Sequence, residues 1–496
     1  MLDRLRNLFR RKPVEAGASR HEMARSAFRS LLARYEAAQS TEENGRHWIG
    51  ADGLSADAAN SPAVRRILRN RARYEAVHNG YFKRLVNITA DDSIGIGPIL
   101  QVLTRDRALN KFIEEQFSEW CDAIDLGTKL HTMKRTRTID GEAFGVLTTN
   151  RKLATAVKLD FRLIEAERVT SPSIMPLAEN EVDGIKLDAD GNPVSYSILR
   201  RHPGGPIPGM TTDYDTWPAR YVIHYFRPER PEQHRGICEL LTALPLGNQL
   251  RRYTLATLTA AEIAALLTLM LESSAEADPE EAEVPFQTLD IERGLMTTLP
   301  VGVKPFQLKA EQPTTVYPQF KREIVGEMGA GYGVPSNIAT GDSSQHNFAS
   351  ARSDGNPYFN MIDIDRDFTS RRVVDRIFGE WLTEALTVAD ADYQINLRDK
   401  LLRPSVKHQW AYRVRQRDID ETKKETARDI RLKNGMTSYQ QEFAAEGLDW
   451  ETAQEQQAEA LGFKNVSEYR EFLRNTLLPQ PSPQSITVEE PARGKQ

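Results

Sequence analysis

A long apolar stretch in the middle of the chain sets the first constraint on the fold. Thr254 to Leu271 is rich in leucine and alanine and is about as long as a membrane-spanning helix requires. Glu262 lies at its centre, where a charge would cost about 3 kcal/mol on membrane-insertion scales. We therefore expect a long helix over Leu246–Glu272, packed on several sides and about 40 Å long at roughly 1.5 Å per residue.

Small side chains in this helix would let a neighbouring helix approach its backbone closely. The alanines concerned are Ala260, Ala261, Ala264 and Ala265. Such positions suit helices that stand side by side in a ring, and they also suit a helix buried in the core of an ordinary monomer. The residues alone leave both interpretations open.

A second segment, residues 326–352, combines a glycine-rich turn with a run of small polar side chains. Helical patterns flank it at Phe320–Met328 and Tyr358–Leu386. Long loops of this kind are uncommon in compact domains and are usually functional or disordered. This segment can contact a polyanion through hydrogen bonds without binding it tightly. Only two of its side chains offer positive charge, and one of them is a histidine that must first be protonated. The candidate ligand-facing residues are Ser343, Ser344, Gln345, His346, Asn347 and Arg352.

The other segments alternate between helical and β-rich patterns. Residues 62–89 and 108–139 have helical periodicity, and residues 144–225 contain short β runs separated by turns. Residues 405–475 look helical, and residues 478–496 have the composition of a disordered tail.

An acidic run follows the long helix and precedes a small β-rich module. It is either a solvated loop or a docking surface for exchanging partners. Its central residues are Glu280, Glu281 and Glu283.

Composition narrows the classes of function. The formal net charge is −5, whereas a protein that grips DNA through its phosphates is usually basic. The only cysteines, Cys121 and Cys238, argue against a disulfide scaffold and a cysteine-rich zinc site. Gly329-x-Gly331-x-Gly333 lacks the preceding strand and following helix that a dinucleotide site needs, and the chain has no P-loop motif. We expect no cofactor and no metal ion.

A nuclease is the enzymatic alternative. Asp160, Glu165 and Glu167 could supply carboxylates for it, although charges on a strand and its turn more often form a solvated face. Ser343, Ser344 and His346 lie too close together in one loop to be read as a catalytic triad, which is recognised by its geometry.

An ordered set of short motifs resembles one protein family. Over residues 25–465, the motifs and the polar segment together resemble the portal proteins of lambda-like tailed phages and prophages. One departure concerns the polar segment: Ser353-Asp354-Gly355-Asn356-Pro357 intervenes before the next helix, which we therefore expect to begin near Pro357. The motifs are Arg69-x-Arg71-Ala72-Arg73-Tyr74, Gly95-Ile96-Gly97, Gly141-Glu142-Ala143-Phe144, Asp183-Gly184-Ile185, His224, Arg235-Gly236-Ile237, Gly294-Leu295-Met296 and Asn434-Gly435-Met436-Thr437.

The resemblance implies a multi-domain α+β portal subunit with long stem helices, assembled into a ring of twelve. The implied domains are a basic N-terminal arm (1–24), a wing that is helical and then β-rich (25–235), a stem helix (236–275), a clip (276–316), a second stem helix (317–334), a channel loop (335–356), a channel helix with a helical crown (357–475) and a disordered tail (476–496).

The resemblance also implies a structural role, not an enzymatic one. The ring would occupy one capsid vertex of the virion after assembly in the host bacterial cytoplasm, without a membrane. It would pass double-stranded DNA during packaging and ejection. It would contact the terminase large subunit, the major capsid and scaffolding proteins, and head–tail adaptors. The polar segment would face DNA, the alanines would pack subunits, and the acidic run would face the motor or adaptor. The alternative is a nucleic-acid-processing enzyme of the phage particle, which would be a monomer or small oligomer.

Overall fold

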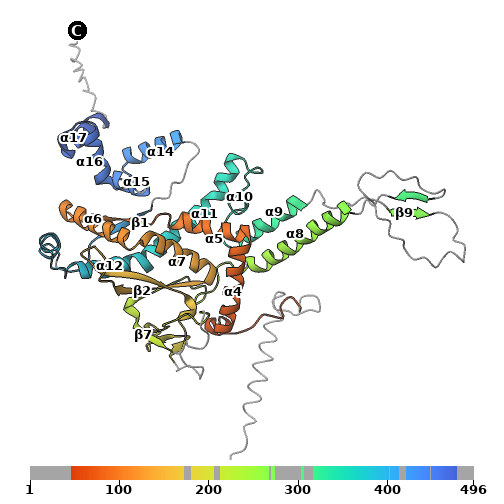
Figure 1. The fold of residues 1–496 in the computed structure, drawn as a ribbon. Helices are drawn as coiled ribbons and strands as arrows, with labels where there is room; N and C mark the ends of the chain where they lie inside the picture. Colours follow the sequence, from red (N-terminus) through yellow and green to blue (C-terminus); the bar gives the residue numbers. More distant parts are fainter. Residues whose placement is uncertain are drawn as a thin grey trace, which may run out of the picture. The chain divides into compact units, whose positions relative to one another are not determined.

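The computed structural model describes residues 46–171, 180–205, 213–266, 270–273, 303–306, 317–401, 403–412, 421–446 and 448–477. The chain divides into two units, Met1–Ala59 and Asn60–Gln496. In the first, residues 46–59 contain one short helix, α3 (Ala56–Ala59). The second unit contains the remaining described elements (Figure 1). The N-terminal arm, the acidic run and the tail lie outside the described residues.

Two antiparallel sheets form the β-rich part of the second unit, as the sequence predicts for residues 144–225. In the first sheet, β2 (Glu142–Thr149) pairs on one side with β3 (Leu159–Ile164) and on the other with β8 (Val222–Phe226). The second sheet has four strands in sequence order, namely β4 (Glu181–Val182), β5 (Ile185–Leu187), β6 (Pro193–Leu199) and β7 (Tyr214–Pro218).

Alternation along β2 decides what each face of the first sheet covers. Ala143 and Leu147 belong to a core shared with helices, whereas Phe144 and Val146 belong to a core shared with the second sheet. Because successive side chains of a strand point to opposite faces, the first sheet becomes the middle layer. The helices of the outer layer are α6 (Arg107–Ala123), α7 (Leu126–Asp140) and α12 (Asp375–Ala385).

A separate helical core lies next to these layers. Asn79 joins its first two helices: its backbone N–H donates to the Glu75 carbonyl, and its side chain accepts from the backbone N–H of Tyr81. The members of this core are α4 (Pro62–His78), α5 (Gly80–Ser93), α8 (Ala243–Leu266), α9 (Tyr317–Ala330), α10 (Ser336–Thr340) and α11 (Phe348–Thr369).

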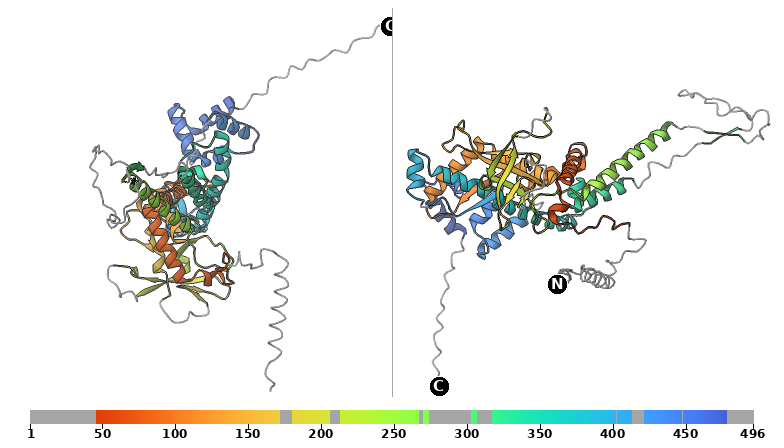
Figure 2. Two further views of the ribbon diagram at one scale, coloured as in Figure 1. Left: turned by 90° about the vertical axis from the view of Figure 1, so that its right-hand side faces the viewer. Right: turned by 90° about the horizontal axis from the view of Figure 1, so that it is seen from below.

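The expected long helix is α8, and α9 runs beside it (Figures 1 and 2). The ring of Tyr253 lies 5.7 Å from that of Tyr317 and 4.8 Å from that of Phe320, which joins the two helices. The prediction that the helix reaches Glu272 is wrong. β9 (Met270–Ser273) is a strand that pairs with β10 (Val303–Phe306), because its β-compatible residues gain a ladder partner there. Among the described residues, no helix is long and apolar enough to span a bilayer.

The helix after the polar segment begins earlier than expected. It starts at Phe348, where Asn347 and Ser350 form a reciprocal capping box that satisfies free backbone donors. Pro357 lies inside α11 instead of starting it. A helix-compatible φ makes this possible, and the proline removes only one backbone donor. From Ser370 the helix continues through a π-helical turn, Ser370–Val374, into α12.

The segment expected to be a channel helix with a helical crown (357–475) also contributes a strand to the body. β11 (His408–Tyr412) pairs antiparallel with β1 (Pro98–Val102). Trp381 of α12 also packs against Phe117 of α6, with ring centroids 5.2 Å apart. The expected wing and crown thus share one core. Four helices beyond β11 form what we call the C-terminal lobe: α14 (Glu421–Lys433), α15 (Tyr439–Ala445), α16 (Trp450–Ala460) and α17 (Val466–Leu477).

Candidate functional site at the base of the helix pair

The chain enters α8 through a segment whose backbone lies directly against the start of β2. A Cβ on Gly236 would come within 2.1 Å of the Gly141 carbonyl oxygen, and one on Gly141 within 2.3 Å of the Ile237 carbonyl carbon. Gly141 also has φ +87°, a conformation that favours glycine. Two motifs far apart in the sequence therefore fix each other's position. We call this region the helix-pair base.

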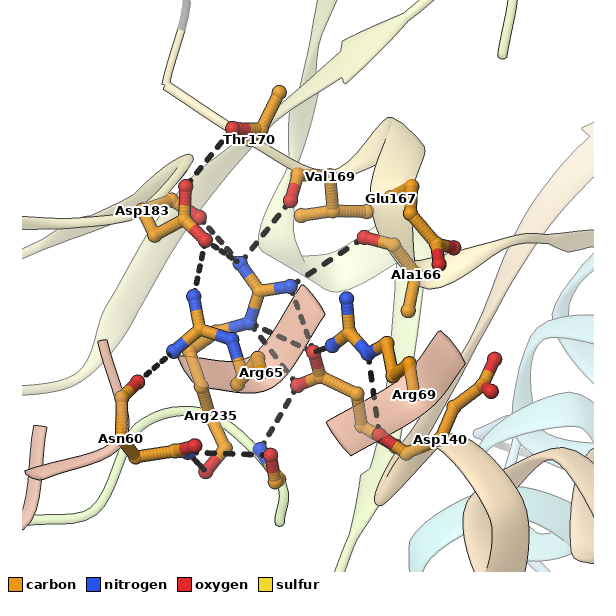
Figure 3. A network of polar contacts seen from close by, with 12 residues as sticks. Asn60, Arg65, Arg69, Asp140, Ala166, Glu167, Val169, Thr170, Asp183 and Arg235 are labelled. Atoms are coloured by element: carbon orange, nitrogen blue, oxygen red, sulfur yellow. Dashed lines mark hydrogen bonds and ion pairs between the residues drawn. The ribbon is translucent and has the colours of Figure 1, made fainter. Parts of the chain in front are cut away.

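A buried carboxylate beside these glycines gathers donors from three parts of the chain, and Figure 3 shows two of these donors, Arg69 and Arg235. Glu142 pairs with Arg69 of α4 and, at 2.7 Å, with Arg235 before α8. His224 of β8 lies 2.9 Å from the same carboxylate, and the backbone N–H of Gly236 donates to it at 2.9 Å. We call this set, with its neighbours Arg65 and Asp183, the Glu142 network.

The network continues outward through further pairs. Arg65 of α4 bonds to Asp183, which also accepts from Arg235 at 3.1 Å. Arg73, one turn beyond Arg69, pairs with Asp140 at 2.5 Å and with Glu167 at 2.9 Å. Positive and negative side chains alternate through the network, so its burial leaves no isolated charge.

Burial and charge act against each other at the centre. Burial alone would raise the pKa of Glu142, but the guanidinium groups of Arg235 and Arg69 hold that pKa well below its usual value. Burial lowers the pKa of His224 despite its contact with Glu142. The carboxylate is therefore ionised and the imidazole neutral at neutral pH, so this site does not act as a proton donor.

A second buried network joins α7 to α11 and to the turn after α9. Arg137 bonds to Glu239 at 2.8 Å and to Asp365 of α11 at 2.5 Å. Lys134 lies 3.0 Å from Asp365, and the hydroxyl of Tyr332 donates to Glu239 at 3.1 Å. Burial would raise the pKa of Asp365, but Lys134 and Arg137 hold it below its usual value. We call this set the Arg137 network.

These networks show what the scattered motifs do. Arg69, Glu142, Asp183, His224 and Arg235 all belong to motifs named above, and the fold brings them to one place. They hold the start of α8 to the sheets. Sequence reasoning did not predict the network itself, although one signal was present: Arg65, Arg69, Ala72 and Ala76 follow one face of α4, and all are buried. Arginines at core positions of a helix point to a buried partner.

The polar segment lies at the surface, where Asp342 pairs with Arg322 of α9 at 3.1 Å and the Ile338 carbonyl accepts from Arg84 of α5 at 2.7 Å. Ser343, Ser344, Gln345 and Asn347 are exposed in the connection from α10 to α11. Arg352 is exposed in the first turns of α11. His346 is half-buried, with its Nε2 3.8 Å from Asp354. Five of the six predicted residues thus lie on a connection shorter than expected, and Arg352 follows in α11.

The other predicted site residues are only partly described. Ala260 and Ala261 are half-buried on α8, and Ala264 and Ala265 belong to the same helix. Glu280, Glu281 and Glu283 lie outside the described residues. Their expected roles stay predictions.

Two of the three carboxylates considered for a nuclease are engaged in ion pairs with basic side chains. Asp160 pairs with Lys129 at 2.9 Å, and Glu167 with Arg73. Glu165 and Glu167 lie near His202, with ligand atoms within 4.8 Å of one another. The Nδ1 atom of His202 accepts from the Gly204 N–H at 3.0 Å, and its Nε2 lies 2.8 Å from Glu165 without forming a hydrogen bond.

Comparisons with known proteins place the chain among phage proteins. A sequence model of the family described as "Phage portal protein, lambda family" matches residues 43–366. The chain is 27% identical over 316 residues to the "Probable portal protein" of Halomonas phage phiHAP-1, covering 58% of this chain and 60% of that relative's length.

Solved structures give a weaker likeness. A chain of the virion of a native gene transfer agent particle is 14% identical, with 76% of this chain and 92% of that chain covered and a TM-score of 0.41. A chain from the neck of the empty particle, computed with C6 symmetry, is 13% identical, with 76% and 92% covered and a TM-score of 0.42. TM-scores this low do not establish a shared fold.

Proposed function

This chain belongs to the lambda family of phage portal proteins, and we propose that it assembles into a ring at one capsid vertex and conducts double-stranded DNA. The family is structural, which removes the nuclease alternative. The chain spans about 60% of the length of the curated relative that it matches. The ring of twelve, the terminase, capsid, scaffolding and adaptor partners, and assembly in the host cytoplasm are therefore part of the proposal.

One observation carries the proposal. The helix pair α8–α9 extends from a base fixed by two buried ion networks, and an exposed polar segment follows α9, to which the Arg322–Asp342 ion pair ties it. A rigid base suits a subunit that must hold its shape while DNA moves past it. We assign the stem to α8 and α9, the clip to the residues between them, and the channel-facing surface to Ser343–Asn347 with Arg352.

Charge supports a passage more than a grip. The chain has a net charge of −5. It therefore lacks the excess of basic side chains that would bind DNA tightly by releasing counterions from the phosphates. Arg352 repeated around a ring would still form a collar of weak phosphate contacts. The acidic residues Glu280, Glu281 and Glu283 would tune docking of a motor and later of an adaptor, because charged rims act mainly on association rates.

The test combines an image with a packaging assay. Negative-stain microscopy and native mass spectrometry of the purified chain should show a large closed ring. Arg352→Glu should leave that ring intact and reduce DNA packaged per particle. Arg151→Glu, an equal charge change at the exposed turn between β2 and β3, is the control. A monomeric chain would contradict the ring, and unchanged packaging by Arg352→Glu would remove this residue from the channel.

A further inference from the structure

An exposed apolar groove runs between α4 and the start of α8. On α4 the stripe Val64, Ile67, Arg71, Tyr74 and His78 faces solvent, although the opposite face of this helix is buried. Its spacing of three and four residues is that of a seam which packs against another helix. Ile67 is 49% and Tyr74 53% exposed. Large exposed side chains aligned in this way mark an interaction surface.

The facing wall of the groove continues the same pattern. Leu241, Pro245, Asn248, Arg252 and Leu255 are exposed at intervals of four and three residues. Between the two walls lies a cavity of about 730 Å³, lined on the α4 side by Leu68 and Tyr74 and on the other by Leu241, Leu244 and Pro245. A groove with two such walls fits one helix laid along it.

Charge indicates which kind of helix fits. Arg71 and Arg252 lie within the two stripes and are exposed, and neither has an ion pair among the residues that the structure describes. A groove with two available guanidinium groups favours an acidic helix with an apolar residue in its seam.

One helix of this same chain has that character. On α11 the residues Asn360, Asp363, Ile364 and Asp367 are exposed, and Ile364 is 52% exposed. Within the part of the chain that the structure describes, these carboxylates pair only with nearby residues of the same helical run, Asp363 with Arg366 at 2.9 Å and Asp367 with Arg371 at 3.0 Å. Exposed pairs within one helix contribute little, so these carboxylates can take new partners at small cost.

The two surfaces are suited to a head-to-tail contact. α5 packs against both α4 and α11 and lies between them (Figure 1). A ring needs two different surfaces on each subunit, one for each neighbour. We propose that the exposed face of α11 in one copy, centred on Ile364, docks into the α4–α8 groove of the next copy. Asp363 and Asp367 then meet Arg71 and Arg252. This inference rests on the proposed ring and assigns its interface.

Complementary charge reversal tests the contact. The groove variant Arg71→Asp/Arg252→Asp and the helix variant Asp363→Arg/Asp367→Arg each place like charges across the interface. Each alone should need a concentration at least about tenfold higher than the wild type to form rings. An equimolar mixture should restore rings in which the two variants alternate, because each groove then meets a helix of opposite charge.

Native mass spectrometry of the full-length chains reads out the result, since the variants differ in mass. Arg151→Asp/Lys152→Asp, two exposed basic residues away from both surfaces, should assemble as the wild type does. Thermal melts check that each variant folds. Rings that form normally from either variant, or a mixture that fails to assemble although both variants fold, overturn the interface. A monomeric wild-type chain overturns the ring as well, which separates the two failures.

Discussion

The helix-pair base and the C-terminal lobe both depend on ion pairs, but they use them in opposite ways. At the base, Glu142 and Arg235 are fully buried, and the Glu142 carboxylate accepts from Arg235 and from the backbone N–H of Gly236. Between the lobe and α6, Lys111 lies 3.1 Å from Glu455 and Arg107 lies 3.4 Å from Glu451. The two basic side chains are more than half exposed, and the two carboxylates are between one third and one half exposed. A buried pair that loses one partner leaves an uncompensated charge, whereas an exposed pair exchanges its partner for water. The base should therefore behave as one rigid piece and the lobe as a docked one.

The largest expected effect comes from neutralising the central carboxylate of the base. Glu142→Gln leaves Arg235 and Arg69 buried with less negative charge, which should lower the free energy of unfolding by about 3–5 kcal/mol. Urea denaturation followed by circular dichroism measures this. Glu455→Gln, the same chemical change at the lobe, should lower it by less than about 1 kcal/mol. An equal decrease in the free energy of unfolding for the two variants would mean that water reaches Glu142. The base and the lobe would then not differ in how they use ion pairs.

A smaller decrease in the free energy of unfolding should follow from forcing apart the two backbone segments that meet at the base. Gly236→Ala places a methyl group about where the Gly141 carbonyl lies, and overpacking of this kind typically costs about 1–3 kcal/mol. The control is Gly379→Ala in α12, where nothing lies within 4 Å of the added carbon. That change should raise the melting temperature slightly, because alanine favours a helix interior. A neutral Gly236→Ala would show that the contact relaxes without strain.

The sequence allowed the elements to be predicted better than their assembly. Periodicity located the long helix and the short β runs, since both signals are local. It could not show that His408–Tyr412 pairs with Pro98–Val102, because a ladder between segments far apart in the chain leaves no local pattern. The start of α11 was misplaced because Pro357 was given more weight than the capping box at Asn347.

The candidate site likewise has one part that could be predicted from local sequence and another that depends on contacts between distant residues. The polar segment was found because its composition is unusual over a short stretch. The Arg137 network was not, because Asp365 meets Arg137 only in the folded chain. Glu142 and Arg235 were noticed as parts of separate motifs, yet their shared purpose depends on a contact between residues far apart in sequence.

A pH-dependent effect should come from the crevice between α6 and the lobe. Glu114 accepts from the Val102 N–H at 2.5 Å, and burial, with the nearby charges of Asp449, Glu451 and Glu115, raises its pKa to about 8. A raised carboxyl pKa gives stability that is fully present below about pH 4.5 and is lost as the pH rises to about 8.

Glu114→Gln should remove this loss. The melting temperature of this variant should match that of the wild type near pH 4.5 and exceed it at pH 9. The difference in the free energy of unfolding at pH 9 should be more than about 1 kcal/mol. Glu119→Gln, on the exposed side of the same helix, is the control and should leave the pH profile nearly unchanged. Parallel profiles for Glu114→Gln and the wild type would mean that Glu114 is well solvated, and the crevice would then be open.

The smallest expected effect is the coupling between Lys111 and Glu455. A double-mutant cycle with Lys111→Met and Glu455→Gln should give about 0.2–1 kcal/mol at low salt. It should give almost nothing at 1 M salt, where the screening length falls to about 3 Å. The matched cycle at the base, with Arg73→Met and Asp140→Asn, should give a larger coupling that salt changes little, because Asp140 is buried. Each cycle follows unfolding in urea at both salt concentrations. If the lobe pair kept a coupling above about 2 kcal/mol in high salt, the lobe would be fixed as firmly as the base, and the two regions would form one rigid body.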